Sequence, residues 1–132
     1  MVIRIVQLGT ARTAGEGLRL GTVRRPPRGV PKAEFAKRDF YDVWLPMLSP
    51  SSELVGQALH AAAAADEREW AAFVRHFRTE MKGADASRLL DLLAALSHQT
   101  DFSLGCYCAD EAWCHRSVLR KLLQEREASI GH

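Results

Sequence analysis

Strand-like segments stand at both ends of this 132-residue chain, and helical segments lie between them. Residues 2–8 (V-I-R-I-V-Q-L) are rich in β-branched side chains and residues 18–24 alternate with period two, which predicts two strands. Residues 102–108 (F-S-L-G-C-Y-C) are apolar on both faces, which predicts a central strand. Because helices must connect strands placed in this order, we predict an α/β fold. It consists of a small, mainly parallel sheet flanked by helices, in a single domain.

The middle of the chain predicts three helices, and a fourth is expected after the last strand. The second is the clearest, because its apolar residues recur at helical spacing from Trp70 to Met81. Gly83 is expected as the C-cap of this helix. The first helix is expected to start near Pro50, with Ser49 as its cap.

Hydrophobic residues make up 47% of the chain, so it can bury a core of its own as one domain over 1–132. The tail from about residue 129 is expected to fray, as chain ends commonly do. No run of ~18 apolar residues indicates a membrane span. Residues 1–8 lack the apolar core and cleavage site of a signal peptide. We therefore expect a cytoplasmic protein without a membrane partner.

Positive charge is concentrated between Arg24 and Arg38, where six basic residues and one acid give a local charge of +5. Residues 24–32, called the arginine loop below, contain three prolines and a glycine. Such a loop is stiff and loses little entropy when it binds a ligand. Arg24, Arg25 and Arg28 therefore fit the recognition of a phosphate or carboxylate. The alternative is that these guanidiniums are solvated or pair with acidic side chains.

Four stretches of the sequence carry a resemblance to a known family. They are G-L-R-L-G-T-V-R-R-P-P-R-G-V-P-K (17–32), Y-D-V-W-L-P-M-L-S-P-S (41–51), W-A-A-F-V-R-H-F-R-T-E-M (70–81) and L-G-C-Y-C-A-D-E-A-W-C-H-R-S-V-L (104–119). In this order they resemble the YeaO-like proteins, a family known only as a numbered domain of unknown function (DUF488). The resemblance covers nearly the whole chain. It implies that the arginine loop and residues 106–116 belong to one site, and it implies no particular reaction or substrate.

The strand-to-helix turn, residues 106–116, carries the residues with the most chemical potential. Cys106 and Cys108 are two apart on a predicted strand, so their side chains are expected on one face. Cys114, His115 and Arg116 are expected in the first turn of the last helix, where free backbone N–H groups attract anions. Open α/β sheets bind ligands at this carboxyl edge of their strands. The same field lowers the pKa of a thiol at the helix start.

An anion site is the first hypothesis for this turn, because Arg116 adds a forked donor to the helix start. Asp110 and Glu111 argue against it, since they supply negative charge to the same helix end. The ligand-binding residues expected under this hypothesis are Arg24, Arg25, Arg28, Trp44, Cys106, Cys108 and Arg116.

An enzyme with Cys114 as its nucleophile is the second hypothesis. His115 is adjacent, but sequence neighbours on a helix point about 100° apart and form a poor nucleophile–base pair. The base is then expected from elsewhere, and Asp110 or Glu111 is a candidate general acid or base. The candidate catalytic residues are therefore Cys114, His115 and Asp110.

Zinc ligation by Cys106, Cys108, Cys114 and His115 is the third hypothesis, because thiolate and imidazole are common zinc ligands. The spacing C-x-C-x5-C-H differs from the usual ligand pairs, and residues 114 and 115 are expected to have difficulty reaching one tetrahedral ion. We therefore assign no metal ligand and expect no cofactor. The plainest alternative is that the strand cysteines are simply buried and His115 is exposed on its helix.

Together these patterns favour a domain that binds a small anion or a phosphate-containing ligand, with a catalytic role left open. A cysteine-dependent enzyme is one alternative. A nucleic-acid-associated module is another, because Tyr41 and Trp44 lie near the basic segment and could stack on bases. A single basic stretch with few aromatic residues gives nucleic acid little support, so a small anionic ligand is the expected partner.

Overall fold

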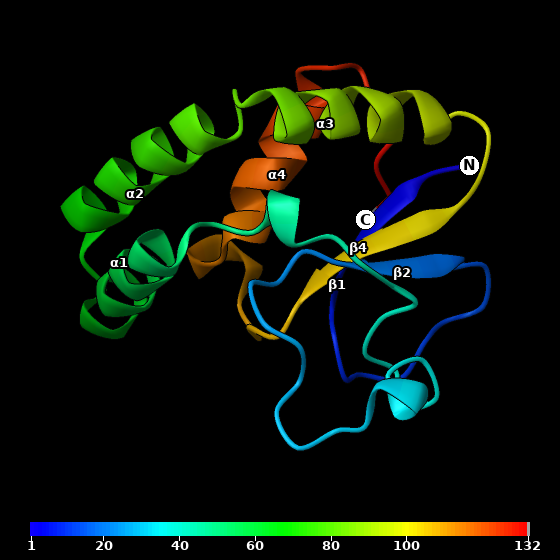
Figure 1. Ribbon diagram of the computed structural model, residues 1–132. Helices are drawn as coiled ribbons and strands as arrows, with labels where there is room; N and C mark the ends of the chain where they lie inside the picture. Colours follow the sequence, from blue (N-terminus) through cyan, green and yellow to red (C-terminus); the bar gives the residue numbers. More distant parts are fainter. Residues whose placement is uncertain (132) are drawn as a thin grey trace.

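The sheet is entirely parallel, with the strand order β1-β4-β2-β3, in the computed structural model, which describes residues 1–131 (Figure 1). Its strands are β1 (Ile3–Gln7), β2 (Leu18–Gly21), β3 (Val43–Trp44) and β4 (Phe102–Cys106). Strand β4 lies between β1 and β2 and is buried along its whole length, as its apolar sequence predicts. The predicted α/β fold in a single domain is confirmed, with parallel pairing throughout.

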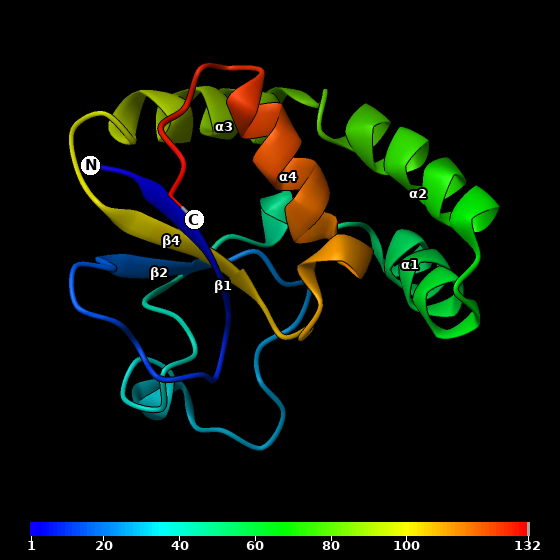
Figure 2. The ribbon, with the colours of Figure 1, turned by 180° about the vertical axis from the view of Figure 1, so that it is seen from behind.

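Helices connect β3 to β4 and follow β4. They are α1 (Ser52–Ala64), α2 (Glu67–Glu80), α3 (Ala84–Leu96) and α4 (His115–Gln124), with short 3-10 turns η1 (Lys32–Glu34), η2 (Pro46–Leu48) and η3 (Glu111–Trp113). Helices α3 and α4 lie over one face of the sheet, and loops lie over the other (Figures 1 and 2). Helices α1 and α2 form a hairpin beyond the carboxyl ends of the strands (Figure 1, left).

Two predicted caps are wrong because composition alone does not place a cap. Helix α1 begins after Pro50, and Ser51 rather than Ser49 is its N-cap. Gly83 is not the C-cap of α2 but the residue before α3. Its φ of −57° and ψ of 150° lie outside the left-handed region that a glycine C-cap uses.

The main core lies between the helices and the sheet. Phe73 and Phe77 of α2 are fully buried, and their rings stack with centroids 5.7 Å apart. Leu119 of α4 and Leu104 of β4 are also fully buried in this core. Burial of each such side chain contributes about 1.5–3 kcal/mol. These contacts fix the start of α4 relative to the end of β4.

A buried ion pair lies on the loop-covered face of the sheet. Arg19 and Glu16 are 1% and 3% exposed, and the guanidinium donates to the Glu16 carboxylate. Arg19 also donates to the backbone carbonyls of Thr10 at 2.8 Å and Asp39 at 2.6 Å. Ser103 Oγ on β4 donates to the carbonyl of Glu16 at 3.1 Å. This network ties the loop between β1 and β2, and the loop between β2 and β3, to the sheet. No sequence pattern indicated this network.

The end of the chain lies against β1, and the fraying expected from residue 129 stays a prediction. The backbone N–H of Ile3 donates to Ser129 O at 2.8 Å, and that of Gly131 donates to Ile3 O at 2.8 Å. Ile130 packs against the core. Because β1 is an edge strand, its free backbone groups are available to the tail. His132 lies outside the described residues.

None of the helices within residues 1–131 is both long enough and apolar enough to cross a bilayer.

Candidate functional site

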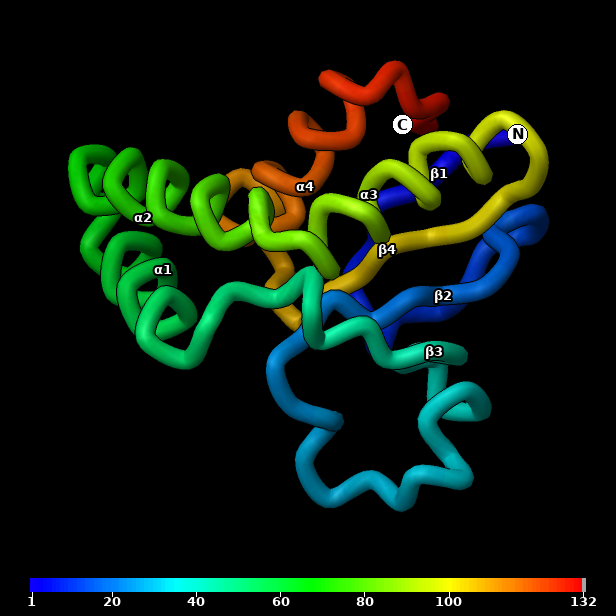
Figure 3. Tube along the Cα trace, turned by 45° about the horizontal axis from the view of Figure 1, so that its top comes forward, coloured from blue at the N-terminus to red at the C-terminus, as the bar shows by residue number. Residues whose placement is uncertain are grey.

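A cavity of about 1020 Å³ opens at the carboxyl ends of β2 and β4. Its walls come from the arginine loop, the start of α1 and the strand-to-helix turn. Figure 3 shows the long excursion of the chain between β2 and β3 that carries the arginine loop. The structure therefore brings together two segments that are far apart in sequence. The predicted site residues that line the cavity are Arg24, Arg25, Arg28, Cys106, Cys108, Cys114 and His115.

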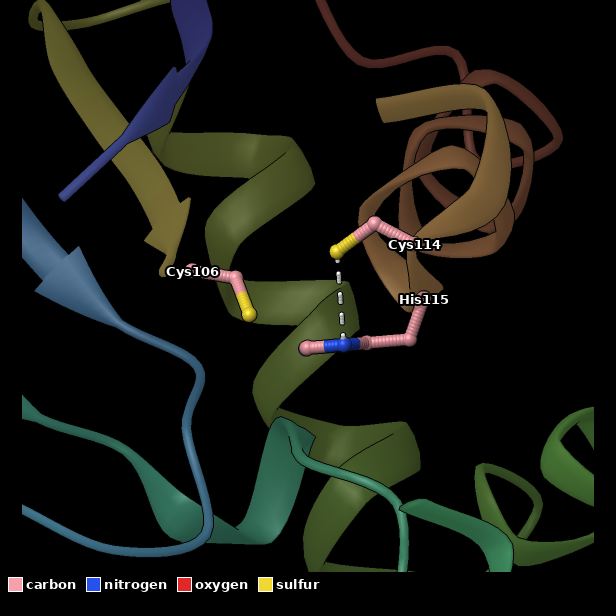
Figure 4. Close-up of side chains that lie close together, drawn as sticks. All are labelled: Cys106, Cys114 and His115. Carbon is pink, nitrogen blue, oxygen red and sulfur yellow. Dashed lines mark hydrogen bonds between the residues drawn. The ribbon is translucent and has the colours of Figure 1, made fainter. Parts of the chain in front are cut away.

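Cys114 and His115 face one another across this turn (Figure 4). The distance from Cys114 Sγ to His115 Nδ1 is 3.7 Å, within hydrogen-bonding range for sulfur. Cys114 has extended backbone angles, φ −130° and ψ 149°, and precedes α4 as its N-cap. The expected divergence of the two side chains is therefore not found, because the 100° rule holds only when both neighbours are helical.

The tautomer of His115 follows from the partners of its other nitrogen. Nε2 lies 2.7 Å from Thr22 O and 3.1 Å from Thr22 Oγ1. The carbonyl can only accept, and the hydroxyl donates its own hydrogen to Gly105 O at 2.9 Å. Nε2 must therefore carry a hydrogen, and in the neutral ring Nδ1 presents a lone pair to Cys114.

His115 is buried, contrary to the expectation of an exposed helix residue. Its side chain is 7% exposed. Its ring packs edge-on against Phe77, with centroids 5.7 Å apart. The apolar contact on one side and Thr22 on the other hold the imidazole in one orientation.

Arg116 does not line the cavity, although it was expected to hold a ligand there. Its Nη1 donates to Val6 O and its Nη2 to Cys108 O, both at 2.6 Å. Its Nε donates to Cys114 Sγ at 3.3 Å. Arg116 thus connects the ends of β1 and β4 and places a fixed positive charge against the Cys114 sulfur.

The thiols of the turn differ in acidity. The pKa of the Cys114 thiol is lowered, because its interactions with Cys106, Cys108 and His115 outweigh the opposing effect of burial. The pKa of Cys106 is raised, first by its interactions with Cys108 and Cys114 and then by burial. Within this coupled group, Cys114 is therefore the thiol that loses its proton most readily.

Three possible metal ligands meet at the same place. The ligand atoms of Cys106, Cys114 and His115 all lie within 4.8 Å of one another, and all three residues are buried. The expected difficulty for adjacent residues 114 and 115 is therefore not found. The extended backbone at 114 turns the sulfur toward the imidazole. Cys108 lies beyond the end of β4, half-buried in the cavity wall.

The arginines of the loop have different environments. Arg24 is half-buried and donates to Ser49 O at 2.9 Å and Pro50 O at 3.0 Å, which braces the loop against the start of α1. Arg25 and Arg28 are exposed in the cavity wall, and no acidic side chain within residues 1–131 pairs with either. Arg25 and Arg28 are therefore the guanidiniums of the loop that no acceptor in the described part of the chain holds, whereas Arg24 uses two of its nitrogens within the protein.

Asp110 lies outside the cavity lining and is exposed. Its carboxylate accepts from Ala112 N at 2.9 Å and caps η3. Glu111 pairs through both oxygens with Arg120, at 2.6 and 2.8 Å. Neither acid caps α4, whose first residues have no side-chain cap. The two carboxylates, expected to supply negative charge to the start of α4, instead bind η3 and Arg120.

Trp44 also lies outside the cavity lining. It is on the edge strand β3, 41% exposed, and its indole N–H donates to Val23 O at 2.8 Å. Its hydrogen bond holds the chain after β2 rather than a ligand in the cavity.

Sequence reasoning missed several residues of the site. Thr22, which orients His115, follows β2 at its carboxyl end, and that position was a usable signal. Tyr107 lines the cavity, and its hydroxyl donates to Arg25 O at 2.9 Å. Leu59 of α1 is 58% exposed and forms part of the cavity wall, although it belongs to the apolar face of its helix. Helical spacing alone does not separate a core face from a cavity wall.

Comparison with known proteins supports the family resemblance over almost the whole chain. The sequence model of a family described as the active DUF488-N3 subclade matches residues 3–127. No curated protein and no solved structure matches the chain significantly. The family match spans every strand and helix and includes both the arginine loop and the strand-to-helix turn. The chain therefore belongs to the DUF488 family, in the subclade described as active DUF488-N3.

Proposed function

We propose that this protein is an enzyme that uses Cys114 as a nucleophile toward a small anionic substrate, with His115 as the base. The proposal joins two sequence hypotheses, an anion site and a cysteine-dependent enzyme, because their residues line one cavity. The description of the matched subclade as active agrees with a catalytic role.

The observation that carries the proposal is the 3.7 Å separation between Cys114 Sγ and His115 Nδ1. Thr22 accepts the hydrogen on Nε2, so the lone pair of Nδ1 is directed at the thiol. A nucleophile, a base within reach and a third group that orients the base form the arrangement found in cysteine-dependent enzymes. Here the third group is a backbone carbonyl, which holds the ring without adding a negative charge.

The reaction begins when Nδ1 of His115 takes the proton from Cys114 Sγ. The thiolate attacks an electrophilic atom of the substrate, the bond to the leaving group breaks, and Nδ1 returns the proton to the leaving group. Water then transfers a proton to Nδ1, and its oxygen attacks the same atom. The bond to sulfur breaks, and the proton passes from Nδ1 to Sγ, which restores the thiol.

Arg116 is a positioning residue in this scheme. Its guanidinium is held by two carbonyls, and its Nε lies 3.3 Å from the sulfur. The fixed positive charge favours the thiolate, as does the uncapped start of α4.

Arg25 and Arg28 supply the charge that selects an anionic substrate. Both line the cavity, and both lack an acidic partner among residues 1–131. Pro26 and Pro27 between them limit the freedom of the loop. The nucleic-acid hypothesis has less support, because Tyr41, one of its two stacking candidates, is 4% exposed and packs against Phe35.

Site-resolved alkylation tests the nucleophile. Reduced, chelator-treated protein is exposed to iodoacetamide at neutral pH, and mass spectrometry follows each cysteine. We expect Cys114 to react at least about tenfold faster than Cys106 and Cys108, since a positioned base activates the thiol. Equally slow reaction of all three cysteines would overturn the proposal.

Two variants assign that reactivity to the histidine. His115→Gln keeps a donor near the Nε2 position for Thr22 but removes the basic nitrogen, and we expect alkylation of Cys114 to slow about tenfold or more. Thr22→Val is the matched control, because it removes only the hydroxyl and leaves the orienting carbonyl. We expect its rate to stay within about threefold of the parent.

A further inference from the structure

Two thiols and one imidazole nitrogen converge on one point beside the cavity. Their ligand atoms lie within 4.8 Å of one another (Figure 4). From this convergence we propose that Cys106, Cys114 and His115 bind one Zn²⁺ ion, with its fourth coordination position open to the cavity. This donor set, soft sulfur with imidazole, is one that Zn²⁺ prefers.

The separations suit a tetrahedral ion. Bonds of about 2.3 Å to sulfur and about 2.05 Å to nitrogen at tetrahedral angles place the two ligand atoms about 3.6 Å apart. The observed distance between Cys114 Sγ and His115 Nδ1 is 3.7 Å. The remaining separations are at most 4.8 Å, compared with about 3.8 Å between two sulfurs bound to one tetrahedral ion.

The outer contacts of the ligands also fit a metal. A zinc-bound histidine usually donates its second ring N–H to a carbonyl or carboxylate, which fixes the coordinating nitrogen. Thr22 O provides this contact at 2.7 Å and leaves Nδ1 to coordinate. The Nε of Arg116, at 3.3 Å, donates a hydrogen bond that a zinc-bound thiolate can accept.

The ligands come from rigid parts of the fold. Cys106 ends the central strand β4, and His115 begins α4 directly after Cys114. Three protein ligands leave one position for water or another small ligand, as in catalytic zinc sites. All three residues line the cavity, so this position is reached from it. Cys108 lines the same cavity but is not in the donor set.

Zinc binding and thiol catalysis exclude one another. Zn²⁺ takes the electron pairs of Cys114 Sγ and His115 Nδ1, and the two thiol protons are released to solvent. The ion therefore blocks both the nucleophile and its base. This consequence rests on the proposed function, whereas the zinc site itself does not.

Cobalt titration tests the site directly. The full chain, reduced and metal-free, is titrated with Co²⁺ and then with Zn²⁺. We expect one equivalent of Co²⁺ to produce thiolate-to-cobalt charge-transfer absorption and tetrahedral ligand-field bands, which Zn²⁺ abolishes. Absence of these bands in the parent protein overturns the proposal.

Three substitutions test the ligand set. Cys106→Ser and Cys114→Ser are each expected to weaken Zn²⁺ binding at least about a hundredfold, more than the loss of an outer contact. Cys108→Ser, the matched control, is expected to bind within about threefold of the parent. Unchanged binding in both ligand variants, or loss only in Cys108→Ser, contradicts the assignment.

Cys106→Ser separates the two proposals, because the serine hydroxyl can still donate to the Cys114 sulfur while the sulfur ligand for zinc is removed. We expect it to keep the fast alkylation of Cys114 while losing protection by Zn²⁺. In the parent protein, one equivalent of Zn²⁺ is expected to slow alkylation of Cys114 at least about tenfold. Fast alkylation without zinc binding overturns only the zinc site, and zinc binding with a slow Cys114 overturns only the proposed enzyme.

Discussion

The Glu16–Arg19 pair and the Cys114–His115 pair are both buried, but they use their hydrogen-bonding capacity differently. The Arg19 guanidinium donates to the Glu16 carboxylate and to backbone carbonyls. In the second pair, Nε2 of His115 is satisfied by Thr22, while Nδ1 faces only the Cys114 sulfur beside a cavity. The Glu16–Arg19 pair forms its hydrogen bonds within the protein. In the Cys114–His115 pair, the thiol and the Nδ1 lone pair lie beside a cavity that a ligand can enter.

This difference separates buried groups that hold the fold from those that can do chemistry. A buried polar network with every partner in the protein makes the fold rigid. A buried titratable group beside a cavity is a candidate for function. Arg116 belongs with Arg19, because all three of its donor nitrogens are engaged by protein atoms.

The largest effect is expected from a substitution that breaks the Glu16–Arg19 pair. Arg19→Met leaves the Glu16 carboxylate buried without its cation. We expect the free energy of unfolding to fall by about 3–5 kcal/mol, as when one partner of a buried ion pair is removed. Urea denaturation followed by circular dichroism measures this loss.

The matched control for this variant is the double substitution Glu16→Gln and Arg19→Met, which removes both charges. We expect it to recover part of the lost stability, because no unpaired charge stays buried. If the free energy of unfolding of Arg19→Met falls by less than about 1 kcal/mol, the Glu16–Arg19 pair does not stabilise the fold as a buried ion pair.

Acidification should weaken the same pair by a smaller step. Burial alone would raise the pKa of the Glu16 carboxyl, but hydrogen bonds from Arg19 and Thr13 outweigh it and hold the pKa below its usual value. A carboxyl whose pKa is lowered by folding stabilises the protein above its unfolded pKa, and this contribution is lost as the pH falls through the folded pKa.

We therefore expect a constant contribution of Glu16 near neutral pH and a loss below the pH where free carboxylates protonate, about pH 4.3. Urea denaturation of the parent and of Glu16→Gln between about pH 7 and about pH 3 measures the difference. The decline of stability should be shallower in Glu16→Gln. If stability declines with the same slope in both proteins, the Glu16 carboxyl makes no pH-dependent contribution to the free energy of unfolding.

Much of the fold could be predicted because it depends on local patterns. The apolar run that forms β4 predicts a central strand wherever it lies, and the spacing from Trp70 to Phe77 predicts the buried face of α2. The contact between the tail and β1 did not follow from such patterns. Ile130 pairs with Ile3 at the free edge of β1, and these residues come from opposite ends of the chain.

The meeting of the two segments at the cavity could be predicted from topology, but the roles of single residues could not. Cys114 faces His115 because its backbone is extended, a property of the turn rather than of the residue type. Arg24 and Arg116 donate to backbone carbonyls, which every residue carries and no sequence pattern marks. Arginines that the sequence does not distinguish therefore have different hydrogen-bond partners in the structure.

Arg25 and Arg28 give the smallest expected effect and the sharpest test of the open site. Iodoacetate carries a negative charge and iodoacetamide does not, so the ratio of their rates at Cys114 measures the field of the cavity. In Arg25→Gln combined with Arg28→Gln we expect this ratio to fall only about threefold to tenfold, because both charges are exposed and screened. Arg88→Gln, an exposed arginine of α3 outside the cavity lining, is the control and should leave the ratio unchanged. Added salt should lower the ratio in the parent but hardly in the double variant. If the ratio is the same in all three proteins, the two guanidiniums are merely solvated. Only the Cys114–His115 pair then distinguishes the cavity from the buried Glu16–Arg19 pair.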